Sequence, residues 1–243
     1  MEGYPFDLSR LTLDEFCFHS NSGKWYPEKK GKSRDVVDAM RTVYWFNALR
    51  LRMPAERQTP SKMERELEQE AYKVSEFGVP YHHNKWRSYG LGRHTPTAPI
   101  VEKADLAYVG TRLMFSHVLW DIMQLRLPIV QHAEAWLARL EPTVQAKLWM
   151  ETSTHGFSGR AKRQKLRRFD FAVFERRASL DTLACLTLLI RIAHVEGKID
   201  YAHEIGYWIS RSLLILSESL QQYGLSRPIY DYYKENILPL GKV

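Results

Sequence analysis

Apolar residues recur at the spacing of an α-helix through most of the chain. The first such stretch begins at Ser33, a residue type that caps free amide groups at a helix start, and ends at Pro54. Asp35 suits the positive end of the helix dipole. The apolar stripe of this predicted helix comprises Val37, Met40, Tyr44, Ala48 and Leu51.

A second helix is predicted from Ser61 to about residue 77, where Gly78 ends it. Ser61 and Glu64 have the spacing of a capping box, in which the two side chains satisfy each other's backbone amides. The apolar stripe of this helix is narrow, so its other face, which includes Glu64, should lie in water. A short helix over 81–89 follows, and then a turn rich in Gly and Pro.

The middle of the chain is more apolar. Residues 100–127 are apolar on nearly every face, which predicts one helix buried inside the domain. Amphipathic helices are predicted over 129–140 and 142–150, because Pro142 suits the first position of a helix. A polar loop is expected over 152–159.

The C-terminal part contains two long apolar helices, over 179–195 and 199–223, joined at Gly197 as an αα-hairpin. Their apolar residues form either a plain core, which we favour, or a dimer or partner interface. These residues are Leu183, Leu186, Ile190, Leu213, Leu216 and Leu220. A short aromatic helix over 229–237 is expected to close the fold.

No segment shows the alternation of a confident strand, so the predicted fold class is an all-α, multi-helix bundle. We expect at least seven helices and no sheet of three or more strands. Composition divides the chain into an irregular, aromatic-rich arm (1–32), a polar helical region (33–99) and an all-α bundle (100–243).

Charge adds the first functional indication. The chain carries a formal net charge of +7 and a sequence pI of about 9.3. Such an excess favours a polyanionic partner, and the alternative is a basic but merely soluble protein. The two cysteines, Cys17 and Cys185, form no framework, the start of the chain lacks a signal peptide, and no apolar run reaches the length of a membrane span. We therefore expect a cytoplasmic protein without a membrane partner.

Several enzyme motifs are incomplete. His203 and Glu204 begin like a zinc-binding HExxH motif, but Tyr207 stands where the second histidine belongs. The sequence after His132 resembles half of a zinc deaminase site, and the required cysteine pair is absent. Neither a nucleophile elbow nor a phosphate-binding glycine loop occurs. We expect no metal, no cofactor and no catalytic residue, and an α-helical enzyme without a recognisable motif is the third-ranked hypothesis.

A basic run is more informative. Six cationic residues fall within 160–168, and if helical they could span adjacent phosphates and release counterions on binding. The alternative is a solvated face or a linker. Phe169, Phe171 and Phe174 follow and are expected to anchor the segment to the core. The basic run comprises Arg160, Lys162, Arg163, Lys165, Arg167 and Arg168.

Residues 84–96 contain Trp86, Tyr89, Gly92, Arg93 and Pro96 at intervals that resemble the end of the recognition helix in Cro/C1-type helix-turn-helix repressors. The resemblance covers about residues 41–106, with the helix from Ser61 in the place of the second helix. The family commonly has Glu where this chain has Gly90, and the connection after Gly78 is longer than in the family.

The resemblance implies that Trp86 and Tyr89 belong to the core and that neighbouring polar side chains face a DNA groove. The candidate contacts there are Asn84, Lys85, Arg87 and Arg93, with His82 and His83 on the same face. The leading hypothesis is a non-enzymatic, nucleic-acid-associated protein, in its most concrete form a DNA-binding transcriptional regulator, with a possible homodimer. The alternative is an accessory subunit of a larger assembly that contacts nucleic acid through its backbone.

Overall fold

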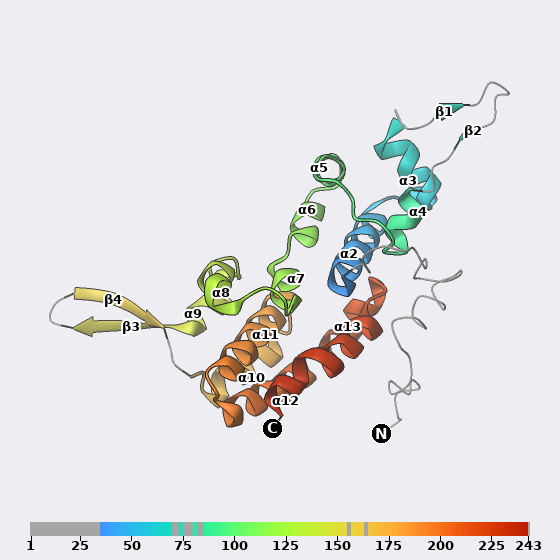
Figure 1. Cartoon of the computed structure of the whole chain (residues 1–243). Helices are drawn as coiled ribbons and strands as arrows, with labels where there is room; N and C mark the ends of the chain where they lie inside the picture. The colour runs from blue at the N-terminus through green and yellow to red at the C-terminus, as the bar shows by residue number, and fades with distance from the viewer. Residues whose placement is uncertain are drawn as a thin grey trace. The chain divides into compact units, whose positions relative to one another are not determined.

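The computed structural model describes residues 35–69, 73–74, 80–81, 85–154, 157–162 and 165–242 (Figure 1). Its strands are described by their backbone. The described chain forms two compact units. The first contains residues up to His117 together with Ser219–Asp231, and the second contains Val118–Glu218 and the residues from Tyr232 onward. The three-part division expected from composition stays a prediction.

The first unit is built from short helices around one long helix. α2 packs against α4 and α6, and α3 packs against α4 and α5. Its elements are α2 (Val36–Arg52), η1 (Ala55–Arg57), α3 (Pro60–Leu67), β1 (Lys73–Val74), β2 (Pro80–Tyr81), α4 (Lys85–Gly90), α5 (Ala98–Ala107), α6 (Thr111–Phe115), the end of α12 (Ile199–Gln222) and most of α13 (Ser226–Tyr232).

The first helix begins later than its sequence predicts. Asp35 is the N-cap, and its carboxylate accepts a hydrogen bond from the Val37 amide at 2.8 Å. Ser33, the predicted cap, lies outside the described residues. α2 buries ten residues, among them Trp45, whose indole lies 5.9 Å from that of Trp86. The predicted apolar stripe is buried except for Leu51, which is exposed because it lies at the C-terminal end of the helix.

The second predicted helix is shorter than expected, and its cap is different. α3 begins at Pro60 after the N-cap Thr59 and ends at Leu67, with Glu68 as its C-cap. The capping box of Ser61 and Glu64 and the length to residue 77 were therefore wrong. Glu64 was predicted to face water, but it is only 4% exposed, because the buried face of α3 is wider than its apolar stripe. The predicted end at Gly78 lies outside the described residues.

Residues 100–127 do not form one buried helix. They form the end of α5, the short α6, and α7 (Val118–Met123), separated by breaks that include Gly110 with a φ of +90°. Only the last of these helices is apolar and buried as predicted, with Trp120 and Ile122 at most 1% exposed. Leu106, Val109 and Leu113 are 86%, 82% and 73% exposed. The spacing of apolar residues did not reveal these breaks, because each of the short helices keeps helical spacing within itself.

The second unit surrounds α11, which packs against α7, α8, α9 and the C-terminal turns. Its elements are α7, α8 (Ile129–Leu137), α9 (Pro142–Leu148), β3 (Trp149–Thr154), β4 (Phe157–Lys162), α10 (Arg168–Arg176), α11 (Leu180–Val195), α12 as far as Glu218, the π-helical η3 (Tyr233–Ile237) and η4 (Leu238–Gly241). The predicted αα-hairpin is confirmed: Ser179 caps α11, and Gly197, with a φ of +68°, joins it to α12.

The centre of the second unit holds one buried cation. Arg191 is 6% exposed, and its guanidinium donates hydrogen bonds to the carbonyls of Ile122 at 2.5 Å and Leu127 at 2.6 Å. It also lies over the ring of Trp136, 5.6 Å from the centroid. Burial lowers the pKa of Arg191. Arg191 of α11 thus satisfies a carbonyl in the last turn of α7 and a second one in the loop that follows it.

The all-α class is confirmed, because helices form the core of both units and each sheet in the described part has only two strands. The polar loop predicted over 152–159 was wrong. β3 and β4 pair antiparallel, with Glu151 opposite Arg160 and Trp149 opposite Lys162. The helix predicted to about Met150 ends at Leu148 for the same reason. The polar run is compatible with a strand, because its β-branched Thr152 and Thr154 favour extended backbone.

Candidate nucleic-acid interface

The predicted site residues fall on two surfaces, one in each unit. Lys85, Arg87 and Arg93 belong to the first unit, and the basic run belongs to the second. Asn84 and Arg163 lie outside the described residues, as do His82 and His83. Arg160 and Lys162 lie in strand β4, so the part of the basic run that precedes α10 is not the helix that was considered.

The α4 surface keeps the core that the sequence predicted. Trp86 and Tyr89 are 0% and 2% exposed, and both rings contact Trp45. The indole N–H of Trp86 donates to Glu68 at 2.7 Å, and the ammonium of Lys85 forms an ion pair with the same carboxylate at 2.8 Å. Lys85 is therefore held by α3, and Arg87 is the exposed cation of this helix. Arg93 follows α4 and is half-buried.

The connection between α3 and α4 comprises residues 68–84. A helix-turn-helix motif typically joins its helices by three to four residues. The resemblance to the repressor family stays a prediction. Its departure at Gly90 has a physical reason, because a Cβ atom there would come within 2.8 Å of the Phe46 ring.

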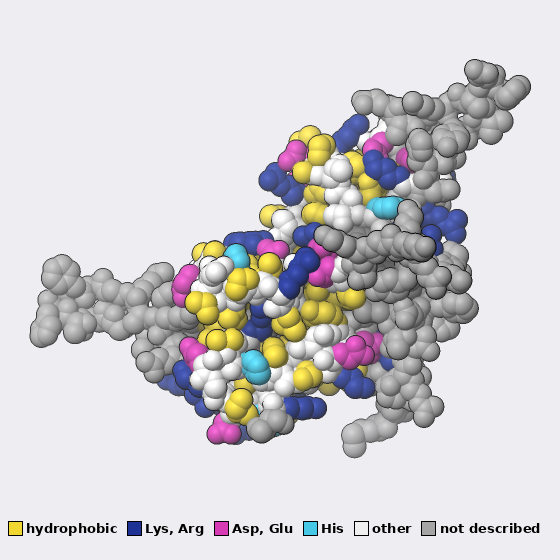
Figure 2. Space-filling model, in the orientation of Figure 1, with side chains coloured by type: hydrophobic (Ala, Val, Ile, Leu, Met, Phe, Trp, Pro, Cys, Tyr) yellow, Lys and Arg dark blue, Asp and Glu magenta, His cyan; other side chains and the backbone are white. Residues whose placement is uncertain are grey.

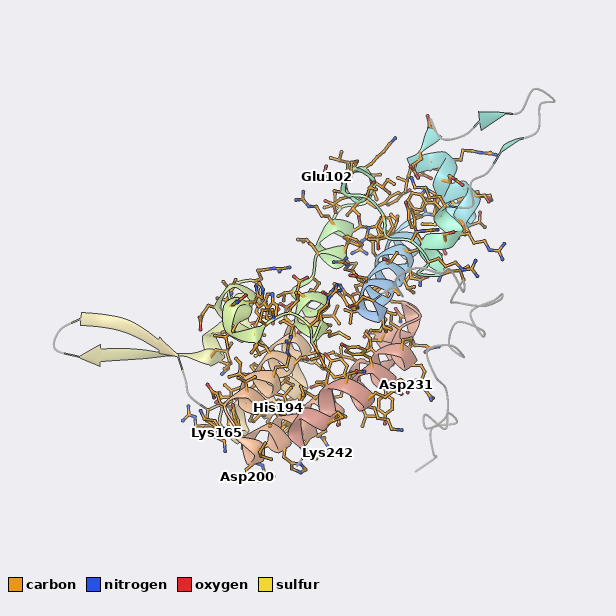
Figure 3. The ribbon with its side chains drawn as sticks, viewed as in Figure 1. Glu102, Lys165, His194, Asp200, Asp231 and Lys242 are labelled. Carbon is orange, nitrogen blue, oxygen red and sulfur yellow. The ribbon has the colours of Figure 1, made fainter. Side chains whose placement is uncertain are left out.

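The second surface surrounds the start of α10. Leu166 is 3% exposed, and its amide donates to the hydroxyl of Tyr201 at 2.9 Å. Asp170 is 2% exposed and accepts a hydrogen bond from the Arg167 amide at 3.1 Å. These two contacts fix the backbone as it enters the helix, so Arg167, Arg168 and Lys165 extend outward (Figure 3 labels Lys165).

One aromatic residue of this segment differs from its expected role. Phe171 and Phe174 are buried as predicted, at 0% and 2% exposure, whereas Phe169 is 66% exposed. The ammonium of Lys147, at the end of α9, lies 5.8 Å from the centroid of the Phe169 ring. Helical spacing contains the signal for this, because Phe169 stands two positions before Phe171 and so faces away from the stripe that Phe171 and Phe174 share.

A hollow of about 160 Å³ lies between α9 and α10, and Lys147, which contacts Phe169, is one of the residues that line it. Arg177, Thr143 and Thr182 also line it. Glu141 also lines it, and the carboxylate of Glu141 accepts a hydrogen bond from Thr143 at 2.6 Å. We call the set comprising Lys147, Lys165, Arg167, Arg168, Phe169 and Arg177 the α10 surface. Lys147, Phe169 and Arg177 are its members that sequence reasoning did not select.

The charge balance of this surface is positive. Residues 165–177 contain five Lys or Arg and two acidic residues. Asp170 is buried at the start of the helix, and Glu175 forms an ion pair with Arg211 of α12, which raises the pKa of that arginine. Lys165 lies 3.3 Å from Glu204 and 5.0 Å from the centroid of the Tyr201 ring. Figure 2 shows Lys and Arg side chains at several places on the visible face, with Asp and Glu side chains among them.

Other kinds of site receive no support from the described residues. No group of three or more His, Cys, Asp or Glu side chains there could hold a metal ion. In the same part of the chain, no helix combines the length and apolar character that crossing a membrane requires. No protein-family model, curated protein or solved structure matches this chain.

Proposed function

We propose that this protein is a non-enzymatic, cytoplasmic, nucleic-acid-associated protein that holds the phosphate backbone with the α10 surface. The observation that carries the proposal is the exposed Phe169 ring among cations, with Lys147 directly over it. Aromatic rings on which bases stack, placed beside cations that follow the backbone, are the combination that binds single-stranded nucleic acid without sequence preference.

The neighbouring elements extend this surface. Lys147 and Arg177 line the same hollow, and Lys and Arg side chains are groups that bind a phosphate. Lys162 and Arg160 lie in the ribbon that leaves the end of α9, the helix that carries Lys147 (Figure 1). A two-stranded ribbon is narrow enough to enter the major groove of a duplex.

The most concrete form of the proposal is a DNA-binding transcriptional regulator, in which α4 would supply sequence specificity. Its support is the exposed Arg87 on a helix anchored by the buried Trp86 and Tyr89. Arg87→Ala should then cost about 1–3 kcal/mol on a preferred duplex and much less on random DNA. Equal losses on both would remove α4 from the recognition surface.

The second candidate function is an accessory subunit of a larger assembly. It is favoured by Leu106, Val109 and Leu113, which together expose apolar surface in the first unit. Exposed apolar patches of this kind mark surfaces that contact other proteins.

The test is fluorescence anisotropy with labelled duplex DNA, single-stranded DNA and RNA over a series of salt concentrations. A variant in which Lys147, Lys165, Arg167 and Arg168 of the α10 surface are changed to Gln should bind every probe more weakly, with a flatter dependence of log affinity on log salt. The matched control removes the same charge elsewhere, by changing the exposed Lys62, Lys103, Lys198 and Lys234 to Gln. Equal affinity and an equal salt slope in the wild type and the first variant would refute the proposal.

A further inference from the structure

The outer face of α12 exposes a stripe of apolar side chains. Tyr207, Leu214 and Ile215 are 56%, 61% and 52% exposed. They share one face of the helix, because residues three, four and seven positions apart lie on the same side. Arg211 and Glu218 lie on this face as well and are exposed.

The opposite face of α12 is buried in the core. Ile205 and Ile209 are 0% exposed, and Leu213, Leu216 and Leu220 are at most 7% exposed. The prediction that the leucines of the C-terminal hairpin are core residues is thus confirmed. Any contact between copies must therefore use a different set of α12 side chains, and the exposed stripe supplies one.

We propose that the α12 stripe binds the α12 stripe of a second copy in antiparallel orientation, around a two-fold axis between Leu214 and Ile215. Arg211 lies three positions before Leu214, and Glu218 lies three positions after Ile215, so the two are equally far from the axis. Arg211 of each copy thus meets Glu218 of the other, and the apolar pair at the centre packs on its own counterpart. A two-fold contact uses the same patch twice, so the patch must be complementary to itself.

The charges on the stripe favour a second copy of this chain as the partner, and they favour the antiparallel orientation. A parallel pairing would place Arg211 against Arg211 and Glu218 against Glu218, and like charges in contact oppose binding. The Arg211 side chain is already ordered, because its guanidinium forms an ion pair with Glu175 and its Nη1 donates to the Tyr207 hydroxyl at 3.5 Å. It retains 48% exposure, which leaves room for a second carboxylate.

The size of the stripe sets the expected affinity. A pair of helices in contact over about three turns buries less than the roughly 1,600 Å² of a standard protein interface. The dimer should therefore be reversible, with a dissociation constant in the micromolar range. The dimer requires no nucleic acid, so its test is independent of the proposed function.

Sedimentation velocity of the full chain over a range of micromolar concentrations tests the proposal. The wild type should pass from monomer to dimer, and the double variant Leu214→Gln, Ile215→Gln should weaken the dimer at least about tenfold. Both positions are more than half exposed, so the variant should retain the helical circular dichroism of the wild type. Val195→Gln is the matched control, because Val195 is an equally exposed apolar residue (60%) on α11. A wild type that stays monomeric, or a double variant that dimerises like the wild type, would overturn the proposal.

The direction of pairing has its own test. Glu218→Lys and Arg211→Glu should each weaken self-association, because each places like charges together twice in the antiparallel dimer. A mixture of the two variants should associate again, because both charge pairs are then complementary. Glu235→Lys, the same charge change at an exposed residue off the stripe, should leave the dimer intact. A mixture that stays monomeric would overturn the antiparallel arrangement.

Discussion

Two phenylalanines on α10 separate binding from folding, because they stand two positions apart and differ in exposure. Phe169 is 66% exposed, whereas Phe171 is 0% exposed and stacks on Trp208 with ring centroids 5.6 Å apart. Phe169→Ala should weaken binding of a single strand about 5-fold to 150-fold, which corresponds to the roughly 1–3 kcal/mol of one base–aromatic stack. The salt slope should not change, because no charge is removed.

Phe171→Ala should act on stability instead. Truncation of a fully buried phenylalanine typically costs about 3–5 kcal/mol, since it leaves a cavity as well as losing apolar burial. Phe169→Ala should cost less than about 0.5 kcal/mol, as most surface substitutions do. Guanidinium unfolding followed by circular dichroism gives both free energies, and anisotropy with a labelled single strand gives both affinities.

Phe169 does not stack on bases if Phe169→Ala binds a single strand as tightly as the wild type. If Phe169→Ala is as destabilising as Phe171→Ala, the Phe169 ring is part of the core and not of a binding surface. The duplex probe provides an internal comparison. Paired and stacked bases are not available to the ring, so loss of affinity for duplex DNA should be smaller than for the single strand.

Three further predictions concern stability. Arg191→Met should lower the free energy of unfolding by about 3 kcal/mol, because it leaves the carbonyls of Ile122 and Leu127 without their charged donor; an unchanged denaturation midpoint would contradict this. Glu68→Ala should lower it by about 1–3 kcal/mol through the buried indole of Trp86, whereas Glu56→Ala, at an exposed residue, should change it little under the same denaturation assay. Burial raises the pKa of Tyr201 to about 12, above the value of about 10 in an unfolded chain, so the folded state holds this proton more tightly. The corresponding stability is complete below about pH 10 and is lost as pH rises toward 12; denaturation curves at several alkaline pH values should show this fall, and it should be smaller in Tyr201→Phe.

Local sequence signals predicted the helices that have strong ends and one continuous apolar face. α11 begins after Ser179, whose hydroxyl accepts from the Thr182 amide at 3.2 Å, and Gly197 turns the chain into α12. Trp86 and Tyr89 are buried, as the resemblance to the repressor family implied. Such features depend on interactions within a few residues, so the sequence contains them directly.

The errors arose where distant contacts decide the outcome. α3 ends at Leu67, and Glu68 turns toward Trp86 and Lys85, which follow much later in the chain. Glu64 looked like a solvent-facing residue, but the packing of α3 against α4 and α5 buries it. The ribbon of β3 and β4 depends on backbone pairing between two polar segments, so a search for alternating apolar residues could not find it.

For the candidate site, the sequence by itself determined which segment is cationic, and the tertiary structure decided what surrounds it. The run from Arg160 to Arg168 is visible as composition. Only folding brings Lys147, from an earlier helix, over the ring of Phe169 and sets Arg177 beside it at the hollow. Folding likewise leaves Tyr207, Leu214 and Ile215 exposed on a helix whose opposite face is core. Periodicity shows that a helix has two faces, but which face is covered depends on the neighbours that pack against it.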